Sequence, residues 1–190
     1  MKKWIFTALA VSALVLPAAA FAGKGTLVKT FGSGEVKVSG GSATIKTHAV
    51  IDPVTDLPGF EYGGVYSKDG PKKAQLDQVT FKFTTDGHVQ GGAPRWSIPI
   101  DTNKDQRVDG YAFLDAAGCG ASVGTNKAKV VTVVSTDNPN CKVVFGDRQY
   151  DNWAKFAAEN TNYRVAKKNI PFIIVDGAAG EFHVYDLQFG

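Results

Sequence analysis

The sequence is poor in the residues that most often carry enzyme chemistry. Its three histidines, His48, His88 and His183, are scattered and show no metal-ligand spacing. Its two cysteines have no nearby histidine or second cysteine pair, which argues against a metal pair or a catalytic thiol. The sequence does not exclude a glycoside hydrolase that uses two carboxylates, because it does not show which carboxylates come together.

The chain also lacks a run of basic residues. Lys and Arg number 21 against 18 Asp and Glu, and Lys2 and Lys3 account for two of the 21. Residues 23–190 therefore carry 19 basic and 18 acidic residues, a formal charge of +1. Such a balance predicts no nucleic-acid partner. After the N-terminal region no segment is long and apolar enough to predict a membrane span.

The first 22 residues have the parts of a secretory signal peptide. Lys2 and Lys3 precede the apolar stretch WIFTALAVSALVLPAAAF, and AFA at 20–22 supplies the small residues of a cleavage site. We therefore predict a signal peptide over 1–22 and one secreted domain over 23–190, either extracellular or periplasmic. In such an oxidising compartment, an even number of cysteines predicts a disulfide between Cys119 and Cys141.

Short alternating segments between turn signals predict a mainly β protein. EVKVSGGSATIKTHAV (35–50) indicates two strands about a Gly40-Gly41 turn. RWSIPID (95–101) places Trp96, Ile98 and Ile100 on one face, in the core, and Arg95 on the opposite face. IPFIIVDG (170–177) is a continuous apolar run, typical of a strand covered on both faces. Further strands are expected in YGGVYSK (62–68), QVTFKFTTDG (78–87), VDGYAFLDA (108–116), AKVVTVVST (128–136), KVVFGDRQY (142–150) and EFHVYDLQFG (181–190).

One segment, DNWAKFAAEN (151–160), has helical rather than alternating spacing. Trp153 and Phe156 share one stripe, Asp151 is the expected cap, and Asn160 is the expected end. Eight or nine strands and this helix predict the fold class: mainly β, a single antiparallel β-sandwich (jelly roll) with one short helix near 151–159.

The order of these segments resembles a known group of domains. GGAPRWSIPID followed by DGYAFLD is similar to the GGSPRF pattern of secreted bacterial jelly-roll domains, and NWAKFAA, IPFIIVDG and FHVYDLQFG follow in the same order. The closing strand also resembles the end of galactose-binding-like and carbohydrate-binding modules. The resemblance covers about residues 60–190 and departs from the pattern at Ala93 and Trp96. It implies a jelly roll and no settled activity.

The segment PIDTNKDQRVDGYAFLD (99–115) contains a candidate calcium loop. Its spacing is similar to EF-hand and dockerin loops, with possible ligands at Asp101, Asn103, Asp105, Arg107 (through its carbonyl) and Asp109. Gln106 stands where EF-hands have glycine, and Ala112 stands where a bidentate glutamate belongs. The alternative is a polar turn between two strands, in which Asp and Asn bind their own backbone, and the departures favour that alternative.

Aromatic and polar side chains give the candidate ligand-binding residues. Tyr62 follows a Pro-Gly loop and Tyr111 follows the acidic loop, so either is a candidate for a pocket at the loop ends; Tyr66 and Arg95 complete the set. The leading hypothesis is a secreted non-catalytic binding module for a glycan or a cell-surface partner. The alternatives are a structural or matrix protein that acts by assembly, and a secreted hydrolase with a carboxylate pair.

Overall fold

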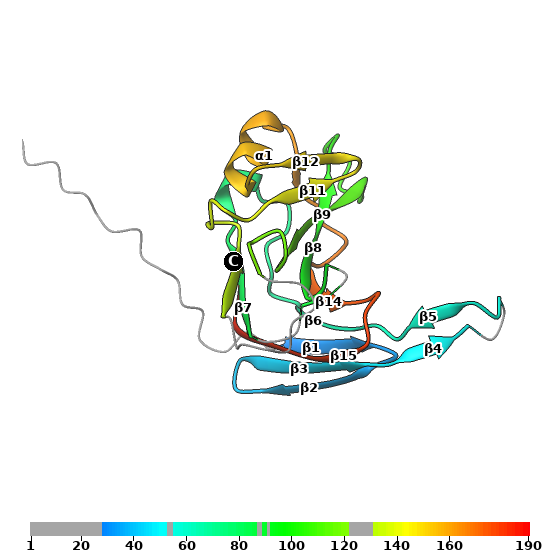
Figure 1. Cartoon of the computed structure of the whole chain (residues 1–190). Coiled ribbons are helices and arrows are strands. Elements are labelled where there is room, and N and C mark those ends of the chain that lie inside the picture. The colour runs from blue at the N-terminus through cyan, green and yellow to red at the C-terminus, as the bar shows by residue number, and fades with distance from the viewer. Residues whose placement is uncertain (1–27, 53–54, 87–88, 91, 122–130) are drawn as a thin grey trace, which may run out of the picture.

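The structure is a computed structural model of the chain, and it describes residues 28–52, 55–86, 89–90, 92–121 and 131–190. Two antiparallel sheets pack together as a β-sandwich, which confirms the predicted fold class (Figure 1). The predicted signal peptide, His88 and residues 128–130 of an expected strand lie outside the described residues.

The two sheets differ in size. The large sheet contains, in spatial order, β1 (Val28–Gly32), β6 (Gly63–Ser67), β14 (Phe172–Val175), β8 (Arg95–Asp101), β9 (Gly110–Asp115), β11 (Val143–Phe145) and β12 (Arg148–Tyr150), with β13 (Arg164–Val165) beside β8. The small sheet contains β10 (Thr132–Ser135), β7 (Phe81–Asp86), β15 (Gly180–Phe189), β3 (Ser42–Thr47) and β2 (Glu35–Ser39).

Eight of these strands have the connectivity of a jelly roll. In chain order they are β3, β6, β7, β8, β9, β10, β14 and β15. Numbered one to eight in that order, they lie as 2-7-4-5 in the large sheet and 6-3-8-1 in the small sheet. Strands that are distant in sequence therefore pair across the fold, which is the double Greek-key arrangement of jelly rolls.

The core lies between the sheets and is centred on Trp96. Trp96 is fully buried, and its ring centroid lies 5.2 Å from that of Phe81 and 5.0 Å from that of Phe189. Ile98 and Ile100 are also fully buried, so the predicted inward face of residues 95–101 is confirmed. These side chains bury apolar surface of both sheets at once. Burial of apolar surface is the main contribution to the stability of such a sandwich.

Two turns show how local sequence sets the strand pairs. Gly40 and Gly41 join β2 to β3 with φ of 56° and 81°, as a two-residue hairpin turn requires. KVVFGDRQY, expected to be one strand, is instead the hairpin of β11 and β12. Gly146 lies in its turn at φ 61°, a backbone conformation that glycine adopts without strain.

The predicted helix is present as α1 (Trp153–Glu159). Its N-cap is Asn152, whose side-chain oxygen accepts a hydrogen bond from the Lys155 N–H, so the expected cap at Asp151 was wrong by one residue. Asn160 ends the helix as predicted. The buried stripe includes Trp153 and Phe156, and α1 packs on the 3-10 helix η1 (Leu76–Gln78).

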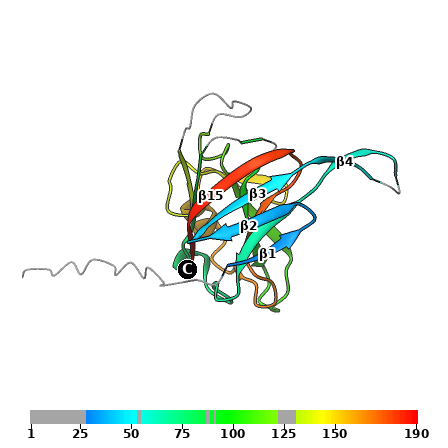
Figure 2. The same ribbon diagram turned by 90° about the horizontal axis from the view of Figure 1, so that it is seen from below.

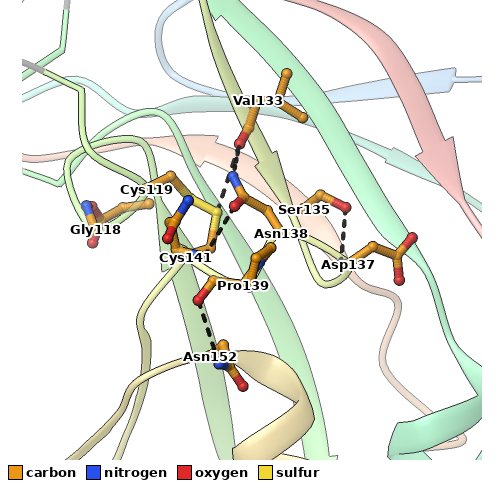
Figure 3. The surroundings of a disulfide bond; sticks show 11 residues. Gly118, Cys119, Val133, Ser135, Asp137, Asn138, Pro139, Cys141 and Asn152 are labelled. Carbon is orange, nitrogen blue, oxygen red and sulfur yellow. Dashed lines mark hydrogen bonds between the residues drawn. A yellow bond between two sulfur atoms is a disulfide. The ribbon is translucent and has the colours of Figure 1, made fainter.

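A disulfide and a projecting hairpin complete the fold. Cys119 and Cys141 form the predicted disulfide, next to the turn that follows β10 (Figure 3). The strands β4 (Ala49–Ile51) and β5 (Pro58–Phe60) pair with each other and project from the sandwich as a hairpin arm (Figures 1 and 2). In the described part of the chain, we found no helix with the length and apolar character needed to cross a membrane.

Candidate functional site

The outer side of the large sheet carries a row of aromatic side chains. Because successive side chains of a strand point to opposite sides, β8 sends Trp96 into the core and Ser97 outward. The register places Ser97 between Phe172 of β14 and Phe113 of β9. Tyr66 of β6 lies opposite Phe172. One row of the outer surface therefore crosses four strands and has three aromatic residues.

Five rings form what we call the aromatic face: Phe31, Tyr66, Tyr111, Phe113 and Phe172. All five are half-buried, so each keeps part of its surface in contact with water. The ring centroids of Phe31 and Phe172 are 5.3 Å apart, those of Phe172 and Tyr111 are 5.8 Å apart, and those of Tyr111 and Phe113 are 6.4 Å apart. Tyr66 joins this chain through Phe31, at 6.2 Å. The face is therefore continuous from β1 to β9.

Aromatic residues are unusual at these positions. In an antiparallel sandwich, one side of each sheet packs on the core and the other side is normally polar. Here the outward positions of β1, β6, β14 and β9 carry rings that contact one another. Large contiguous apolar patches on the surface of a folded domain often mark interaction sites, which makes this face the candidate site.

Charged groups lie beside the aromatic face, at the start of β8 and just after β14. Arg95 points outward as predicted, and its Nη2 donates a hydrogen bond to Asp176 Oδ2 at 2.7 Å. The Arg95 guanidinium carbon also lies 4.9 Å from the centroid of the Phe113 ring, which is within cation–π range. The two charged side chains remain 24% and 34% exposed, so this ion pair adjoins water and the rings.

Both tyrosines of the aromatic face bring a hydroxyl group to an otherwise apolar surface. The Tyr111 hydroxyl accepts a hydrogen bond from Asn169 Nδ2 at 2.9 Å. Tyr111 was expected to line a pocket at the loop ends, but its strand position places it on the aromatic face with Phe113. The face therefore combines flat apolar rings with polar groups at its edges.

Tyr62 is not part of the aromatic face. It lies between β5 and β6, where the hairpin arm joins the sandwich, and it is 48% exposed. Within the described residues, no ring contact connects Tyr62 to the five rings. Of the four ligand-binding residues predicted from sequence, the structure brings together Tyr66, Arg95 and Tyr111 and leaves Tyr62 apart.

Sequence reasoning missed Phe31, Phe113 and Phe172. Phe113 lies two residues after Tyr111 on the same strand, so alternation alone assigns both to one side. The run IPFIIVDG was interpreted as covered on both faces, but burial alternates along β14. Ile173 is fully buried, whereas Phe172 is half-buried on the outer side. These residues could have been found from the alternation within each strand. They are aromatic residues at the positions whose side chains point away from the core.

The acidic loop joins β8 to β9 and is built from turns that bind their own backbone. Asp101 is 4% exposed; its Oδ1 accepts from the Lys104 N–H at 2.6 Å and its Oδ2 from the Gln106 N–H at 2.8 Å. Asn103 Oδ1 accepts from the Asp105 N–H, and Asp105 Oδ1 from the Arg107 N–H, both at 2.8 Å. Each of these side chains thus satisfies a backbone donor two to five residues further on.

Asp109 closes the same loop from its far end. The N–H and the hydroxyl of Thr102 both donate to Asp109 Oδ2, at 2.7 and 2.6 Å. The hydroxyl and backbone hydrogen bonds from Thr102 hold the pKa of Asp109 below its ordinary value, because they favour the charged carboxylate. In the described parts of the chain, no three His, Cys, Asp or Glu side chains come together in a way that suits a metal ion.

The hydrogen bonds of the loop favour the turn over the calcium site, and calcium binding stays a prediction. We expect the thermal midpoint of the protein to be the same in millimolar calcium and in excess chelator, because the loop carboxylates already bind backbone N–H groups. Differential scanning calorimetry measures this directly. A midpoint that rises with calcium concentration would contradict the expectation, since an ion bound only by the folded state stabilises it.

Comparison of the chain with protein-family models, with curated proteins and with solved structures found no match. The aromatic face is therefore assigned by its geometry alone.

Proposed function

We propose that this protein is a secreted, non-catalytic module that binds an extracellular glycan on the aromatic face of the large sheet. The observation that carries the proposal is the continuous chain of five rings, joined by four ring contacts, on the outer side of a jelly-roll sheet. The C–H groups of a pyranose ring present an apolar surface that packs on aromatic rings, while its hydroxyl groups require polar partners. The aromatic face supplies both kinds of contact.

The polar groups at the edge suit a neutral rather than a strongly anionic sugar. Arg95 is paired with Asp176, and Asp115 lies opposite Arg95 on the neighbouring strand, so the positive charge is locally balanced. Hydrogen bonds that involve such charged groups are stronger than those between neutral groups, which gives them value in orienting hydroxyls. Affinity then comes from several modest contacts on a preformed surface.

Removing the two tyrosine rings should abolish most glycan binding. In a polysaccharide pull-down and a glycan array, we expect the wild-type protein to retain at least one extracellular polysaccharide. The double variant Tyr66→Ala/Tyr111→Ala should bind that ligand at least about tenfold more weakly, because truncated aromatic anchors at interfaces cost more than 1 kcal/mol each.

Tyr62→Ala is the matched control for this variant. It removes the same side chain from a position outside the aromatic face, so it should bind the glycan like the wild type. A circular dichroism melt of each variant shows whether the fold is retained. Equal loss of binding in the control, or no glycan retained by the wild type, would count against the proposal.

A second candidate function, assembly of the chain with itself, is favoured by the hairpin arm. The arm exposes Ile51 (59%), Leu57 (62%) and Phe60 (45%), and in the described residues β4 and β5 pair only with each other. Both outer edges of the arm are thus open to another strand. β10 is also an edge strand, and the neighbouring Val131 is 59% exposed, but the strand has only four residues.

The assembly function predicts a specific response to charge on the arm. If copies associate through it, Ile51→Lys/Leu57→Lys should convert a concentration-dependent oligomer into a monomer, because buried lysines oppose the contact. Asn140→Lys/Gln149→Lys adds the same charge at exposed positions elsewhere and should leave association unchanged. Sedimentation velocity over a hundredfold concentration range makes the measurement. A wild-type protein that stays monomeric throughout would remove this candidate.

A further inference from the structure

A concave site lies apart from the aromatic face, between η1, α1 and the turn that follows β10. It is a groove of about 580 Å³, within the size range of small-molecule sites. Leu76, Val79 and Trp153 form its apolar lining together with Tyr163. None of the residues of the aromatic face lines it. The groove therefore requires its own explanation.

The lining of the groove is held in place by packing and by one buried hydrogen bond. The indole N–H of Trp153 donates to the Leu76 carbonyl at 2.7 Å, which ties α1 to η1. Trp153 is 4% exposed, and its ring centroid lies 5.2 Å from that of Phe156. On the groove side of α1, Ala154 and Ala158 are exposed and small, so the helix leaves room beside the indole. The shape is preformed.

The rim of the groove is acidic. Asp77 and Asp137 both line it, both are exposed, and within the described residues neither carboxylate has a hydrogen-bond or ion-pair partner. Figure 3 shows the Asp137 carboxylate directed away from the disulfide and its neighbours. Among the described residues that line the groove there is no lysine, arginine or histidine, although the whole chain has a formal charge of +3. Two unpaired negative charges thus border an apolar surface.

The charged side chains of α1 are already paired away from this groove. On α1, Lys155 binds Asp151 at 2.7 Å, and the Glu159 carboxylate accepts from Arg148 at 3.0 Å. These pairs leave the two carboxylates at the rim without a compensating charge from the helix. A concave surface lined by charge of one sign attracts ligands of the opposite sign.

We propose that this groove binds a small organic cation with an apolar body, such as a primary or quaternary alkylamine. Its hydrocarbon part packs on Trp153, Leu76 and Val79, and its ammonium group lies between Asp77 and Asp137. The proposal does not depend on the glycan function, because the two surfaces share no residue. It assigns the chain a second ligand of a different chemical class.

Three probes of equal length and different charge test the proposal: n-hexylammonium, n-hexanol and n-hexanoate. Each is titrated into the ¹⁵N-labelled protein while amide and indole resonances are followed by NMR. We expect hexylammonium to shift the Trp153 indole N–H and the amides of residues 152–158, saturably, with a Kd on the order of 1 mM. Hexanol should bind about tenfold more weakly and hexanoate more weakly still. Equal affinities for the three probes, or no shift in these residues, overturn the proposal.

Charge-matched variants separate the groove from general electrostatics. Asp77→Asn/Asp137→Asn should weaken hexylammonium binding about tenfold, to the level of hexanol. Asp69→Asn/Asp147→Asn removes the same charge from exposed positions away from the groove and should bind hexylammonium like the wild type. If both double variants lose affinity equally, the ammonium group does not sit at the rim and the proposal fails.

A third variant tests the place of binding without changing charge. Ala158→Phe puts a large side chain on the exposed, groove-facing side of α1 and leaves the core unchanged. It should remove the shifts caused by hexylammonium and by hexanol alike, while the melting temperature stays near that of the wild type. Retained binding in this variant overturns the assignment to the groove.

Discussion

Replacing Trp96 by alanine should lower the free energy of unfolding by about 3 to 5 kcal/mol. The side chain is fully buried between the sheets, and its ring contacts those of Phe81, Phe83 and Phe189, with centroids 5.2, 6.1 and 5.0 Å away. Truncation loses the transfer free energy of the indole and leaves a cavity that the rigid sheets fill only in part. Urea denaturation followed by circular dichroism measures the difference.

Trp96→Phe is the informative control for this position. It keeps an aromatic ring in the core and removes the indole Nε1, which is buried and has no hydrogen-bond partner among the residues that the structure describes. An unpaired buried donor is unfavourable, so its loss offsets part of the lost packing, and we expect a cost of only about 1 kcal/mol. A cost for Trp96→Ala below about 1 kcal/mol would contradict the central place of this residue in the core.

Removing the disulfide should cost about 3 kcal/mol. Cys119 and Cys141 are 22 residues apart, and in the chain-entropy model a link that closes such a loop restricts the unfolded state by about that amount. Figure 3 shows the disulfide beside a hydrogen-bonded turn, in which Asn138 Nδ2 donates to the Val133 carbonyl at 2.9 Å. The double variant Cys119→Ala/Cys141→Ala should therefore unfold at lower urea concentration than the oxidised protein.

Reduced wild-type protein is the control for the cysteine variants. Treatment with a thiol reductant breaks the same link without removing the Cys141 side chain, which is fully buried. The reduced protein should lose slightly less stability than the double variant, because its thiols still fill the core. A double variant as stable as the oxidised wild type would show that the disulfide does not constrain the unfolded chain.

Much of the fold follows from local pattern. The alternation in residues 95–101 assigned Trp96 to the core and Arg95 to the outer side, and both assignments are confirmed. The helix was recognised from the spacing of Trp153 and Phe156. Such patterns work because burial of one face of an element is decided by its own side-chain period.

Other elements depend on contacts that no local pattern contains. β1 lies beside β6, and β14 lies between β6 and β8, through pairings between segments distant in the chain. Those pairings bring Phe31, Tyr66, Phe172 and Tyr111 together, so the aromatic face was not visible in any one segment. The hairpin arm was missed because β4 and β5 have three residues each, too few for a period to be recognised.

The acidic loop shows a different limit of sequence reasoning. The spacing of Asp101, Asn103 and Asp105 suits a cation and also suits a series of turns, because both use oxygens directed at one point. Sequence alone left the two alternatives open. The structure shows those oxygens accepting from backbone N–H groups, with Gln106 at φ 71°, where EF-hands have glycine.

The most direct test of the account is to map a bound glycan on the protein. A polysaccharide fragment retained in the pull-down is titrated into the ¹⁵N-labelled protein, and the shifted amides are located on the fold. The account predicts that they follow β6, β14, β8 and β9, including Tyr66, Tyr111 and Phe172. Shifts confined to the hairpin arm or to the groove beside α1 would contradict it, because the glycan would then bind away from the aromatic face.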